Sequence, residues 1–301
     1  MMNGIVVVDK AAGFTSHDVV AKMRGICGQR KIGHTGTLDP MATGVLPVCL
    51  GNATKLCDML AEKDKEYVAQ LLLGMETDTQ DVTGQVTARH SVDVTESQVR
   101  DAAASFVGEY LQVPPMYSAL KVDGKKLYEL ARAGKEVERK ARPVVIHELE
   151  ILECRLPEVG LRVVCSKGTY IRTLCADIGE RLGCGGTMKN LRRTRVGRFT
   201  LESAYTLEEL QQRKDNGSLQ PLILPTESVF TEYPVLHVSE SARSLLDNGN
   251  AILPGQTMEQ RTYGEGQWVR MQQPDGSFAG IYAYETARGW YKPVKMFLEK
   301  E

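Results

Sequence analysis

The sequence lacks several features that would have assigned it to a membrane, secreted or disulfide-linked class of protein. No apolar run approaches the ~20 residues that a membrane helix needs, and the run at residues 5–8 is too short for a signal peptide. Cysteine occurs seven times, an odd number, and no Cys-x-x-Cys pair is present. We therefore expect reduced, mostly buried thiols in a cytoplasmic protein.

Motifs for metal, nucleotide and nicotinamide chemistry are also missing. The five histidines share no ligand spacing with each other or with cysteine. The Gly-rich run at residues 183–186 follows a predicted helix instead of preceding one, which is typical of a helix stop and not of a phosphate-binding loop. No Gly-x-Ser-x-Gly elbow occurs. The sequence therefore predicts neither a metal site nor a nucleotide cofactor.

The net charge is only −1, but the charges are unevenly distributed. Residues 1–198 carry 28 basic and 24 acidic side chains, whereas residues 199–301 carry 9 and 14. Two basic segments stand out: residues 121–142 hold eight basic side chains, and residues 187–198 hold five and no acidic one. Such segments occur on proteins that bind polyanions and also on ordinary solvated faces. Charge alone leaves both interpretations open.

Hydrophobic periodicity predicts an α+β fold with a mixed sheet. Strand patterns at residues 5–8, 67–73, 144–153 and 161–165 are not each separated by a helix, which argues against a doubly wound parallel sheet. Helices are expected from Ser16, Thr169 and the capping boxes at Thr95 and Thr206, with Gly108 stopping the second along the chain. We expect one domain over residues 1–228, with residues 121–142 as an insertion. A small, mostly β domain should follow over residues 229–301, with a hairpin at 268–271 and 278–282.

The segment from residue 33 to 44, GHTGTLDPMATG, has neither helical nor strand periodicity. Its three Gly, three Thr and Asp-Pro predict a loop. Asp39 is its sole carboxylate, and a carboxylate held in such a loop can serve as a nucleophile or a base. Alternatively, Asp39 caps a helix that begins at Pro40, and His34 is a structural hydrogen-bonding residue. The residues by themselves do not decide between these interpretations.

Residues 33–51, GHTGTLDPMATGVLPVCLG, closely resemble the catalytic motif of the bacterial tRNA pseudouridine-55 synthases of the TruB type. Six further segments resemble motifs of that family in the same order. They are DKAAGFTSHDVV (9–20), KEYVAQLLLG (65–74), TDTQDVTG (77–84), PPMYSALKVDGKKLYELARAG (114–134), KGTYIRTL (167–174) and LRRTRVGRF (191–199). The resemblance covers about residues 5–200. One departure is Ala11, where the family usually has proline after the lysine of its first motif.

The resemblance implies roles for residues that periodicity would assign to the core or to loops. Asp39 corresponds to the essential aspartate of the family, and Arg172 to the arginine that pairs with it. Tyr67 corresponds to a tyrosine that stacks on the target base, although its strand pattern also fits a core position. Tyr170 and Leu191 correspond to a tyrosine and a leucine of the pocket. His34 corresponds to a histidine that meets the RNA where the flipped base leaves its stack, and Lys10 and Asp81 to supporting residues.

The resemblance also implies the substrate and the partners. The expected reaction is isomerisation of uridine 55 in the T-loop of tRNA to pseudouridine, on a flipped-out base and without cofactor or metal. We expect the basic segments to contact the RNA backbone, with residues 121–142 as a mobile thumb that closes on the T-stem-loop. Residues 229–301 resemble a PUA domain. We expect a cytoplasmic monomer without membrane contact, whose RNA-backbone residues are Lys125, Lys126, Arg192 and Arg193.

Two other functions, a folding chaperone and a guide-RNA-dependent enzyme, remain open at this stage, and a third class, the glycosidases, fits poorly. The chain could be a tRNA-binding folding chaperone, although the complete set of Asp39, Tyr67 and Arg172 favours catalysis. It could resemble the guide-RNA-dependent relatives of the family, but these normally carry extra sequence before the first motif, which here begins near residue 9. A glycosidase requires two carboxylates at its site, whereas the motif supplies one.

Overall fold

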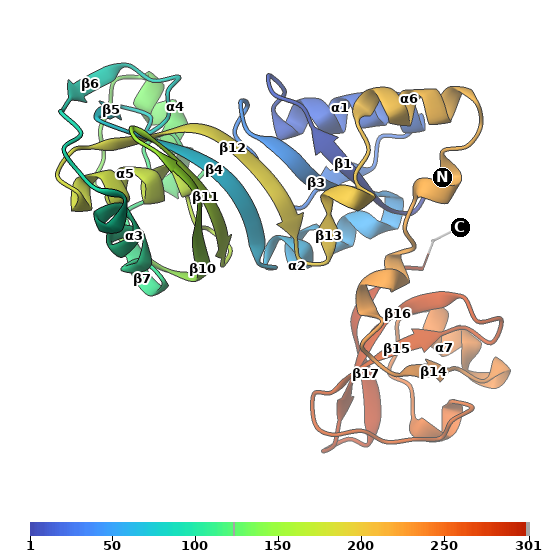
Figure 1. Ribbon diagram of the computed structural model, residues 1–301. Coiled ribbons are helices and arrows are strands. Elements are labelled where there is room, and N and C mark those ends of the chain that lie inside the picture. Colours follow the sequence, from blue (N-terminus) through green and yellow to red (C-terminus); the bar gives the residue numbers. More distant parts are fainter. Residues whose placement is uncertain (123, 299–301) are drawn as a thin grey trace.

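The computed structural model describes residues 1–122 and 124–298. Within these residues the chain forms a large mixed sheet with helices packed on it, and a separate small sheet near the C-terminus (Figure 1). The prediction of an α+β fold with a mixed sheet and a small C-terminal β unit is therefore confirmed. The PUA-like identity of that unit and the division at residue 228 stay predictions.

The large sheet has nine strands among the described residues, in the order β1-β3-β12-β4-β11-β10-β7, with β2 paired to β3 and β13 to β12. Every neighbouring pair is antiparallel except β12 and β3, which are parallel. The strands are β1 (Gly4–Lys10), β2 (Ile32–His34), β3 (Thr43–Leu50), β4 (Lys65–Leu73), β7 (Gly108–Gln112), β10 (Arg142–Arg155), β11 (Glu158–Cys165), β12 (Gly186–Val196) and β13 (Phe199–Thr200).

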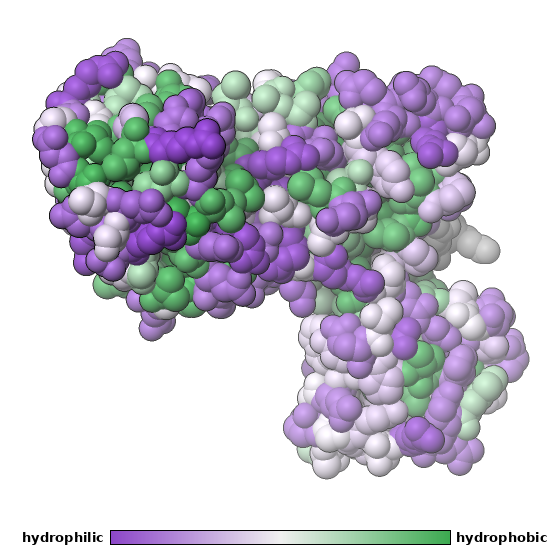
Figure 2. Space-filling model, in the orientation of Figure 1, coloured by the Kyte–Doolittle hydropathy of each residue, from purple (hydrophilic) through white to green (hydrophobic). Residues whose placement is uncertain are grey.

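Strand β4 runs through the middle of this sheet and shows why these residues form it. Tyr67, Ala69, Leu71 and Leu73 alternate with more exposed residues and point into one hydrophobic cluster. Each buried leucine of this kind contributes roughly 1.5–3 kcal/mol to stability. Two helices, α3 (Glu96–Ala104) and α5 (Ile171–Arg181), cover that face. The alternate residues, Val68 among them, lie on the open face, which Figure 2 shows as a mixture of green and purple side chains.

The helices begin where the sequence provides capping residues. Thr15, Thr95 and Thr206 each accept a hydrogen bond from the backbone three residues on, and the residue there bonds back. Two of these helices, α1 (Ser16–Cys27) and α6 (Leu207–Asp215), lie side by side over β1 and β3 (Figure 1). The remaining helices are α2 (Cys57–Ala61), α4 (Leu127–Arg132) and α7 (Arg243–Asp247).

The C-terminal unit is a four-stranded sheet in the order β14-β15-β16-β17. Its strands are β14 (Val235–His237), β15 (Trp268–Gln272), β16 (Phe278–Glu285) and β17 (Trp290–Met296), so the hairpin predicted at 268–271 and 278–282 is confirmed. Phe230, Phe278 and Phe297 pack together with Ile5 and Val7 of β1. This shared cluster joins the C-terminal unit to the first strand of the large domain.

Short elements complete the described chain. Two small hairpins are formed by β5 (Met75–Thr77) with β6 (Val86–Arg89) and by β8 (Lys121–Val122) with β9 (Lys125–Lys126). The 3₁₀ helices are η1 (Gly51–Leu56), η2 (Leu201–Ser203), η3 (Gln220–Leu222), η4 (Thr226–Phe230), η5 (Glu240–Ala242) and η6 (Pro254–Gln256). No helix in the described part of the chain is long and apolar enough to cross a membrane.

Two sequence-based expectations need correction. The helix expected to stop at Gly108 ends at Ala104, and Gly108 instead opens strand β7. The basic segment 187–198 contains the long central strand β12, which periodicity did not predict. Register shifts at Met188 to Asn190 and at Arg193 to Arg195 interrupt the alternation along β12. A strand with such bulges does not show the period of two on which the prediction depends.

Candidate active site

The segment that holds Asp39 is an irregular loop of residues 35–42 between strands β2 and β3. Leu38 and Ala42 are buried and pack into the cluster that contains Tyr67. The backbone N–H of Leu38 donates to the Ser16 hydroxyl at 2.9 Å, which anchors the loop to the start of α1. Residues 40 and 41 form a turn that leads into β3, and no helix begins at Pro40. The alternative in which Asp39 caps a helix is therefore wrong.

Lys10 anchors the same loop through hydrogen bonds of its buried ammonium group. Its side chain is fully buried, and its Nζ donates to the carbonyl oxygens of Ala11, Phe14 and Pro40 at 3.0, 2.7 and 3.0 Å. Burial lowers the pKa of Lys10 to about 8, while the charge of Asp39 opposes that shift. Because Pro40 follows Asp39 directly, this ammonium holds the backbone next to the carboxylate. Ala11, the departure from the family motif, contributes only a backbone carbonyl here.

Asp39 forms an ion pair with Arg172, the second residue of α5. The Nη2 of Arg172 donates to Asp39 Oδ1 at 3.2 Å and to the Tyr117 carbonyl at 2.7 Å. The Nη1 of Arg172 lies 3.7 Å from Asp81 Oδ2. The side chain of Arg172 is 6 % exposed, whereas that of Asp39 is 38 % exposed. Arg172 therefore holds Asp39 from the protein side, and the carboxylate remains open to solvent on the other.

The surroundings of Asp39 act on its pKa in opposite directions. Burial of the carboxyl group raises its pKa, and the neighbouring Asp81 charge adds to that rise. The charges of Arg172 and Lys10 lower it. Without these two cations the pKa of the Asp39 carboxyl group would be higher, and the group would stay protonated up to a higher pH. Arg172 thus favours the ionised form that a nucleophile or a base requires.

Tyr67 lies on β4, in the same cluster as the loop residues Leu38 and Ala42. It is 8 % exposed, and burial raises the pKa of its phenol. Tyr67 is therefore a core residue, as its strand pattern predicts, and it also packs in the same cluster as the loop that holds Asp39. Because Tyr67 shares this cluster with the loop, and the charge of Asp39 acts on its phenol, an aromatic side chain is available close to Asp39.

Tyr170 and Leu191 flank this position from two other elements. Tyr170 is the N-cap residue of α5, and its backbone exchanges hydrogen bonds with the Gln112 side chain at 2.8 and 3.0 Å. The Arg172 guanidinium lies 6.0 Å from the centre of the Tyr170 ring. Leu191 lies opposite Ala69 across the β12–β4 pair and packs partly against the same cluster. The tertiary structure thus brings both residues to the face of the sheet that carries Tyr67.

His34 ends strand β2, just before the loop. Its Nδ1 accepts a hydrogen bond from the Gly36 N–H at 3.3 Å, and its ring meets that of His17 edge to face at 5.3 Å. Burial lowers the pKa of His34 to about 4, and the charges of His17 and Arg193 act in the same direction. His34 is therefore a neutral imidazole at physiological pH, able to hydrogen-bond but not to act as a cation.

Comparison with known proteins completes the description of this site. The family model for the TruB family pseudouridylate synthase N-terminal domain matches residues 24–171, and the model for the tRNA pseudouridylate synthase B C-terminal domain matches residues 172–231. The tRNA pseudouridine synthase B of Lachnoclostridium phytofermentans is 49 % identical over 99 % of this chain and 100 % of its own. The chain belongs to the TruB family of pseudouridine synthases.

Other relatives and structures agree with this membership. The tRNA pseudouridine synthase B of Alkaliphilus oremlandii is 42 % identical over the whole of both chains. A chain in the structure of an H/ACA RNP bound to a substrate RNA containing 2′-deoxyuridine is similar in fold, with a TM-score of 0.73 and 26 % identity over 99 % of this chain and 86 % of that chain. A chain of a Cbf5-Nop10-Gar1 complex has a TM-score of 0.73 and 29 % identity, over 98 % and 85 %. This TruB-family chain is a tRNA pseudouridine synthase, an isomerase.

One predicted RNA contact does not fit the structure of this TruB-family chain. Arg193 is 1 % exposed, and its guanidinium donates to the carbonyls of Val45 and Gly36. A phosphate in solvent cannot reach it, so its assignment to the RNA backbone is wrong. The sequence put Arg193 in a run of basic residues, and periodicity gave no sign that this one points inward, because the register shifts of β12 obscure its alternation.

The other three predicted backbone contacts lie nearer to solvent. Arg192 pairs with Asp9 at 2.7 Å and remains partly exposed. Lys125 is exposed, and Lys126 is half-buried with its Nζ 3.3 Å from the Tyr128 hydroxyl. Within the described part of residues 121–142, only Leu127 is buried. This insertion therefore presents its lysines on an exposed surface, which is what a phosphate contact requires.

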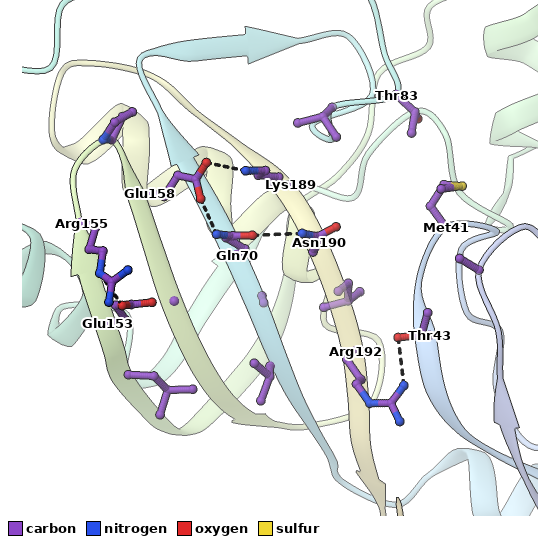
Figure 3. A pocket seen from close by; sticks show the side chains of 18 residues that line it. Met41, Thr43, Gln70, Thr83, Glu153, Arg155, Glu158, Lys189, Asn190 and Arg192 are labelled. Carbon is purple, nitrogen blue, oxygen red and sulfur yellow. Dashed lines mark hydrogen bonds and ion pairs between the residues drawn. The ribbon is translucent and has the colours of Figure 1, made fainter. Parts of the chain in front are cut away.

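A groove of about 980 Å³ crosses the open face of the sheet, opposite the face that carries Tyr67 (Figure 3). It reaches Met41 of the loop that holds Asp39 and Thr43 at the start of β3. Many of its polar and charged side chains pair with one another. Glu158 accepts hydrogen bonds from Gln70 and Lys189, as the dashed lines show. Among its basic side chains, Lys189 pairs with Glu158 and Arg155 with Glu153, whereas Arg192 pairs with Asp9 and remains partly exposed.

Sequence reasoning missed the groups that hold the predicted residues in place. The Tyr117 carbonyl, the Ser16 hydroxyl and the Gln112 amide each orient a residue of the site. A backbone carbonyl is common to every residue type, so no sequence signal marks Tyr117. In the sequence Ser16 is only the first residue of a predicted helix, and Gln112 only a polar residue two positions before Pro114.

Proposed function

We propose that this protein converts a uridine in the T-loop of tRNA, at position 55, to pseudouridine, with Asp39 as the reacting carboxylate. The observation that carries this proposal is the pairing of Asp39 with the buried Arg172, in a loop that packs over Tyr67. Family membership supports the reaction class, and the printed names of the relatives support tRNA as the substrate.

The reaction is an isomerisation, so its atoms balance within the substrate. The N1–C1′ bond of uridine breaks, the uracil rotates, and a C5–C1′ bond forms. The hydrogen on C5 leaves as a proton, and N1 gains one. Nothing is oxidised or reduced, and no group is donated from outside. The residues around Asp39 therefore need only bind the base, act on the sugar and move protons.

The uridine has to leave its stack before a carboxylate can reach its sugar. Flipping a base costs a few kcal/mol, and less in a loop than in a duplex. Stacking on an aromatic ring returns about 1–3 kcal/mol per base. Tyr67 shares a hydrophobic cluster with Leu38 and Ala42 of the loop of Asp39, and Leu191 packs against the same cluster. Tyr170 lies beside Arg172, the partner of Asp39. We infer that Tyr67 stacks on the uracil and that His34 occupies the point where the base leaves the RNA.

Asp39 can act on the sugar in two ways. It can attack C1′ as the uracil leaves, or it can remove a proton from C2′ to give a glycal. Both steps need an ionised carboxylate, which the charge of Arg172 favours. They differ in whether a C2′–H bond breaks. A primary isotope effect on the single-turnover rate with C2′-deuterated uridine would identify proton removal, and its absence would identify attack on C1′.

RNA binding is assigned to basic groups that are at least partly open to solvent, two on the basic insertion and one that lines the groove of Figure 3. We infer that Lys125, Lys126 and Arg192 contact phosphates, and that residues 121–142 close on the T-stem-loop as a thumb. Helix α4 and the β8–β9 hairpin give this insertion little buried surface, so it can move at low cost in free energy. We also infer that residues 1–228 form the catalytic domain and that residues 229–301 form a PUA-like RNA-binding domain.

The test is mass-spectrometric mapping of pseudouridine in tRNA after incubation with the pure protein, without any guide RNA. The native protein is expected to modify position 55. Asp39→Asn is expected to yield no product while it keeps its affinity for tRNA, because the phosphate contacts lie elsewhere. Asp93→Asn removes an exposed carboxylate before α3 and is the matched control, expected to be fully active.

Three outcomes would contradict parts of the proposal. Residual turnover of Asp39→Asn above a hundredth of the native value would mean a loss of less than about 3 kcal/mol of transition-state stabilisation, too little for the reacting group. Product only in the presence of a guide RNA would identify a guide-dependent enzyme. Native protein that refolds tRNA without forming pseudouridine would identify a chaperone.

A further inference from the structure

Arg193 occupies the centre of the large sheet, between the catalytic loop and the strand of Tyr67. On β12 it lies directly opposite Tyr67 of β4 and opposite Gly44 of β3. Residues directly opposite each other in a sheet project their side chains to the same face. The guanidinium of Arg193 therefore lies on the same face as the Tyr67 ring, below the loop of Asp39.

Gly44, which lies opposite Arg193 on the other side of β12, lets β3 approach Arg193 closely. A Cβ atom at Gly44 would lie 2.1 Å from the Arg193 carbonyl oxygen, so a side chain there would clash with the backbone of β12. Its φ of +104° is also in the region that favours glycine. The close approach brings the start of β3, and with it the loop, over the guanidinium.

The contacts of Arg193 reach three parts of the site. Its Nε donates to the Val45 carbonyl of β3 at 2.7 Å, and its Nη2 to the Gly36 carbonyl of the loop at 3.3 Å. Gly36 lies three residues before Asp39. Tyr67 lies opposite Arg193 across the β12–β4 pair, and its phenol is close enough for the guanidinium charge to lower its pKa. One side chain therefore ties the loop to the strand that follows it and lies beside the Tyr67 phenol.

The positive charge of Arg193 is not neutralised by a carboxylate. Among the described residues, none of the ion pairs within 4.0 Å includes Arg193, although its side chain is 1 % exposed. Two more buried cations, Lys10 and Lys65, lie close enough for its charge to lower their pKa values. An unpaired buried cation destabilises a fold by several kcal/mol unless dipoles compensate it. An apolar side chain would fill this position at less cost, so stability alone does not account for arginine here.

We propose that Arg193 is a positioning residue of the isomerisation, which holds the Tyr67 hydroxyl and the loop of Asp39 in a single arrangement. This inference rests on the proposed contact of Tyr67 with the uracil. The planar guanidinium suits the task, because its five N–H donors leave in fixed directions and reach several acceptors at once. A lysine would keep the charge, but its single nitrogen could not reproduce the separate directions of the Nε and Nη2 hydrogen bonds.

The test compares Arg193→Met and Arg193→Lys with Tyr67→Phe and with the Arg193→Met/Tyr67→Phe double variant. Single-turnover rates at saturating enzyme separate the chemical step from tRNA binding, which is measured in parallel. We expect Arg193→Met to slow the chemical step by roughly 100-fold, the size of effect that a misplacement of about 1 Å can produce. Arg193→Lys should recover part of the rate, and tRNA affinity should be unchanged in both.

Two readouts distinguish positioning from a general loss of stability. If Arg193 acts through Tyr67, the double variant should be no slower than the slower single variant, since the two changes remove one interaction. The alkaline limb of the pH profile that depends on Tyr67 should move to higher pH in Arg193→Met, because the phenol loses a neighbouring cation. Lys65→Met removes another buried cation of the sheet, one that bonds the Ala61 carbonyl, and should leave both readouts unchanged.

Specific outcomes would overturn the inference. A folded Arg193→Met protein with the native rate would do so, and so would multiplicative rate losses in the double variant. If Arg193→Met does not fold, Arg193→Lys decides: a native rate contradicts the inference, and a slower rate that is not additive with Tyr67→Phe supports it. Full activity of Tyr67→Leu would instead overturn the proposed role of Tyr67, which separates the two failures.

Discussion

Arg172 reaches Asp39 across 133 residues of sequence, and its Nη2 lies 3.2 Å from the carboxylate Oδ1. The two residues come from different kinds of structure: Asp39 from an irregular loop, and Arg172 from the first turn of α5. The same guanidinium donates to the Tyr117 carbonyl, in the segment that leads to the basic insertion. The proposed closure of that insertion on RNA would therefore act on Arg172, the residue that favours the ionised form of Asp39.

Removal of Arg172 should change the pH dependence of the reaction. Burial raises the pKa of Asp39 and Arg172 lowers it, so Arg172→Met leaves the pKa higher than in the native protein. Asp39 must be ionised, so activity falls as pH falls through this pKa. The acidic limb of the single-turnover pH profile should therefore move to higher pH.

A matched control is Arg162→Met, which breaks ion pairs with Glu66 and Glu148 on the same sheet. Its acidic limb should remain where the native limb lies. An Arg172→Met protein whose acidic limb does not move would show that Arg172 does not govern the ionisation of Asp39.

Tyr67 variants should separate the ring from the hydroxyl. Tyr67→Phe keeps an aromatic surface and should keep tRNA affinity, with a slower chemical step because the hydroxyl beside Arg193 is lost. Tyr67→Leu removes the stacking surface and should lose turnover far more than binding. Rapid-quench measurement of product, with filter-binding of the same tRNA, checks both. If the Leu variant turned over at the native rate, Tyr67 would be only a core residue.

Neutralising Lys125 and Lys126 together should weaken tRNA binding and reduce its salt dependence. For every phosphate that the variant no longer neutralises, the slope of log K against log salt should become shallower by about 0.7–0.9. The single-turnover rate of bound tRNA should change little, because the base is handled by residues elsewhere. Affinities measured over a range of salt concentrations give the slope.

The control for the lysine pair is Lys22→Ala/Lys214→Ala, which removes two exposed lysines on α1 and α6. Its slope should equal that of the native protein. An unchanged slope in the Lys125/Lys126 variant would mean that these lysines form only a solvated surface.

His34 should make stability fall in mild acid. Its folded pKa of about 4 lies below the ordinary value of 6.5, so between these pH values the unfolded chain binds more protons than the folded one. The free energy of unfolding should therefore decrease as pH falls from about 6.5 to about 4. Urea unfolding across this range checks it, and His34→Gln should lose less stability than the native protein. An imidazole NMR titration of His34 with a midpoint near 6.5 would contradict the assignment.

Much of the fold followed from local patterns. The strand that carries Tyr67 and the helix that begins after Tyr170 have regular periods of two and 3.6, so both were predicted near their observed bounds. The capping boxes at Thr95 and Thr206 marked two helix starts, because a cap is a contact between residues three apart. β12 was missed because its bulges break the period, and Arg193 was misassigned for the same reason.

The sequence by itself determined the family, because its motifs are strings of neighbouring residues and can be recognised without any knowledge of packing. It also identified Asp39 as the candidate reacting carboxylate, because no other acidic residue lies in the Gly/Thr loop. Only the tertiary structure decided what surrounds that carboxylate. Arg172, Lys10 and Arg193 are all cations in the sequence, yet one pairs with Asp39, one holds the backbone beside it, and one lies buried under the loop. Those differences depend on distance and burial in space, which a charge count along the chain does not contain.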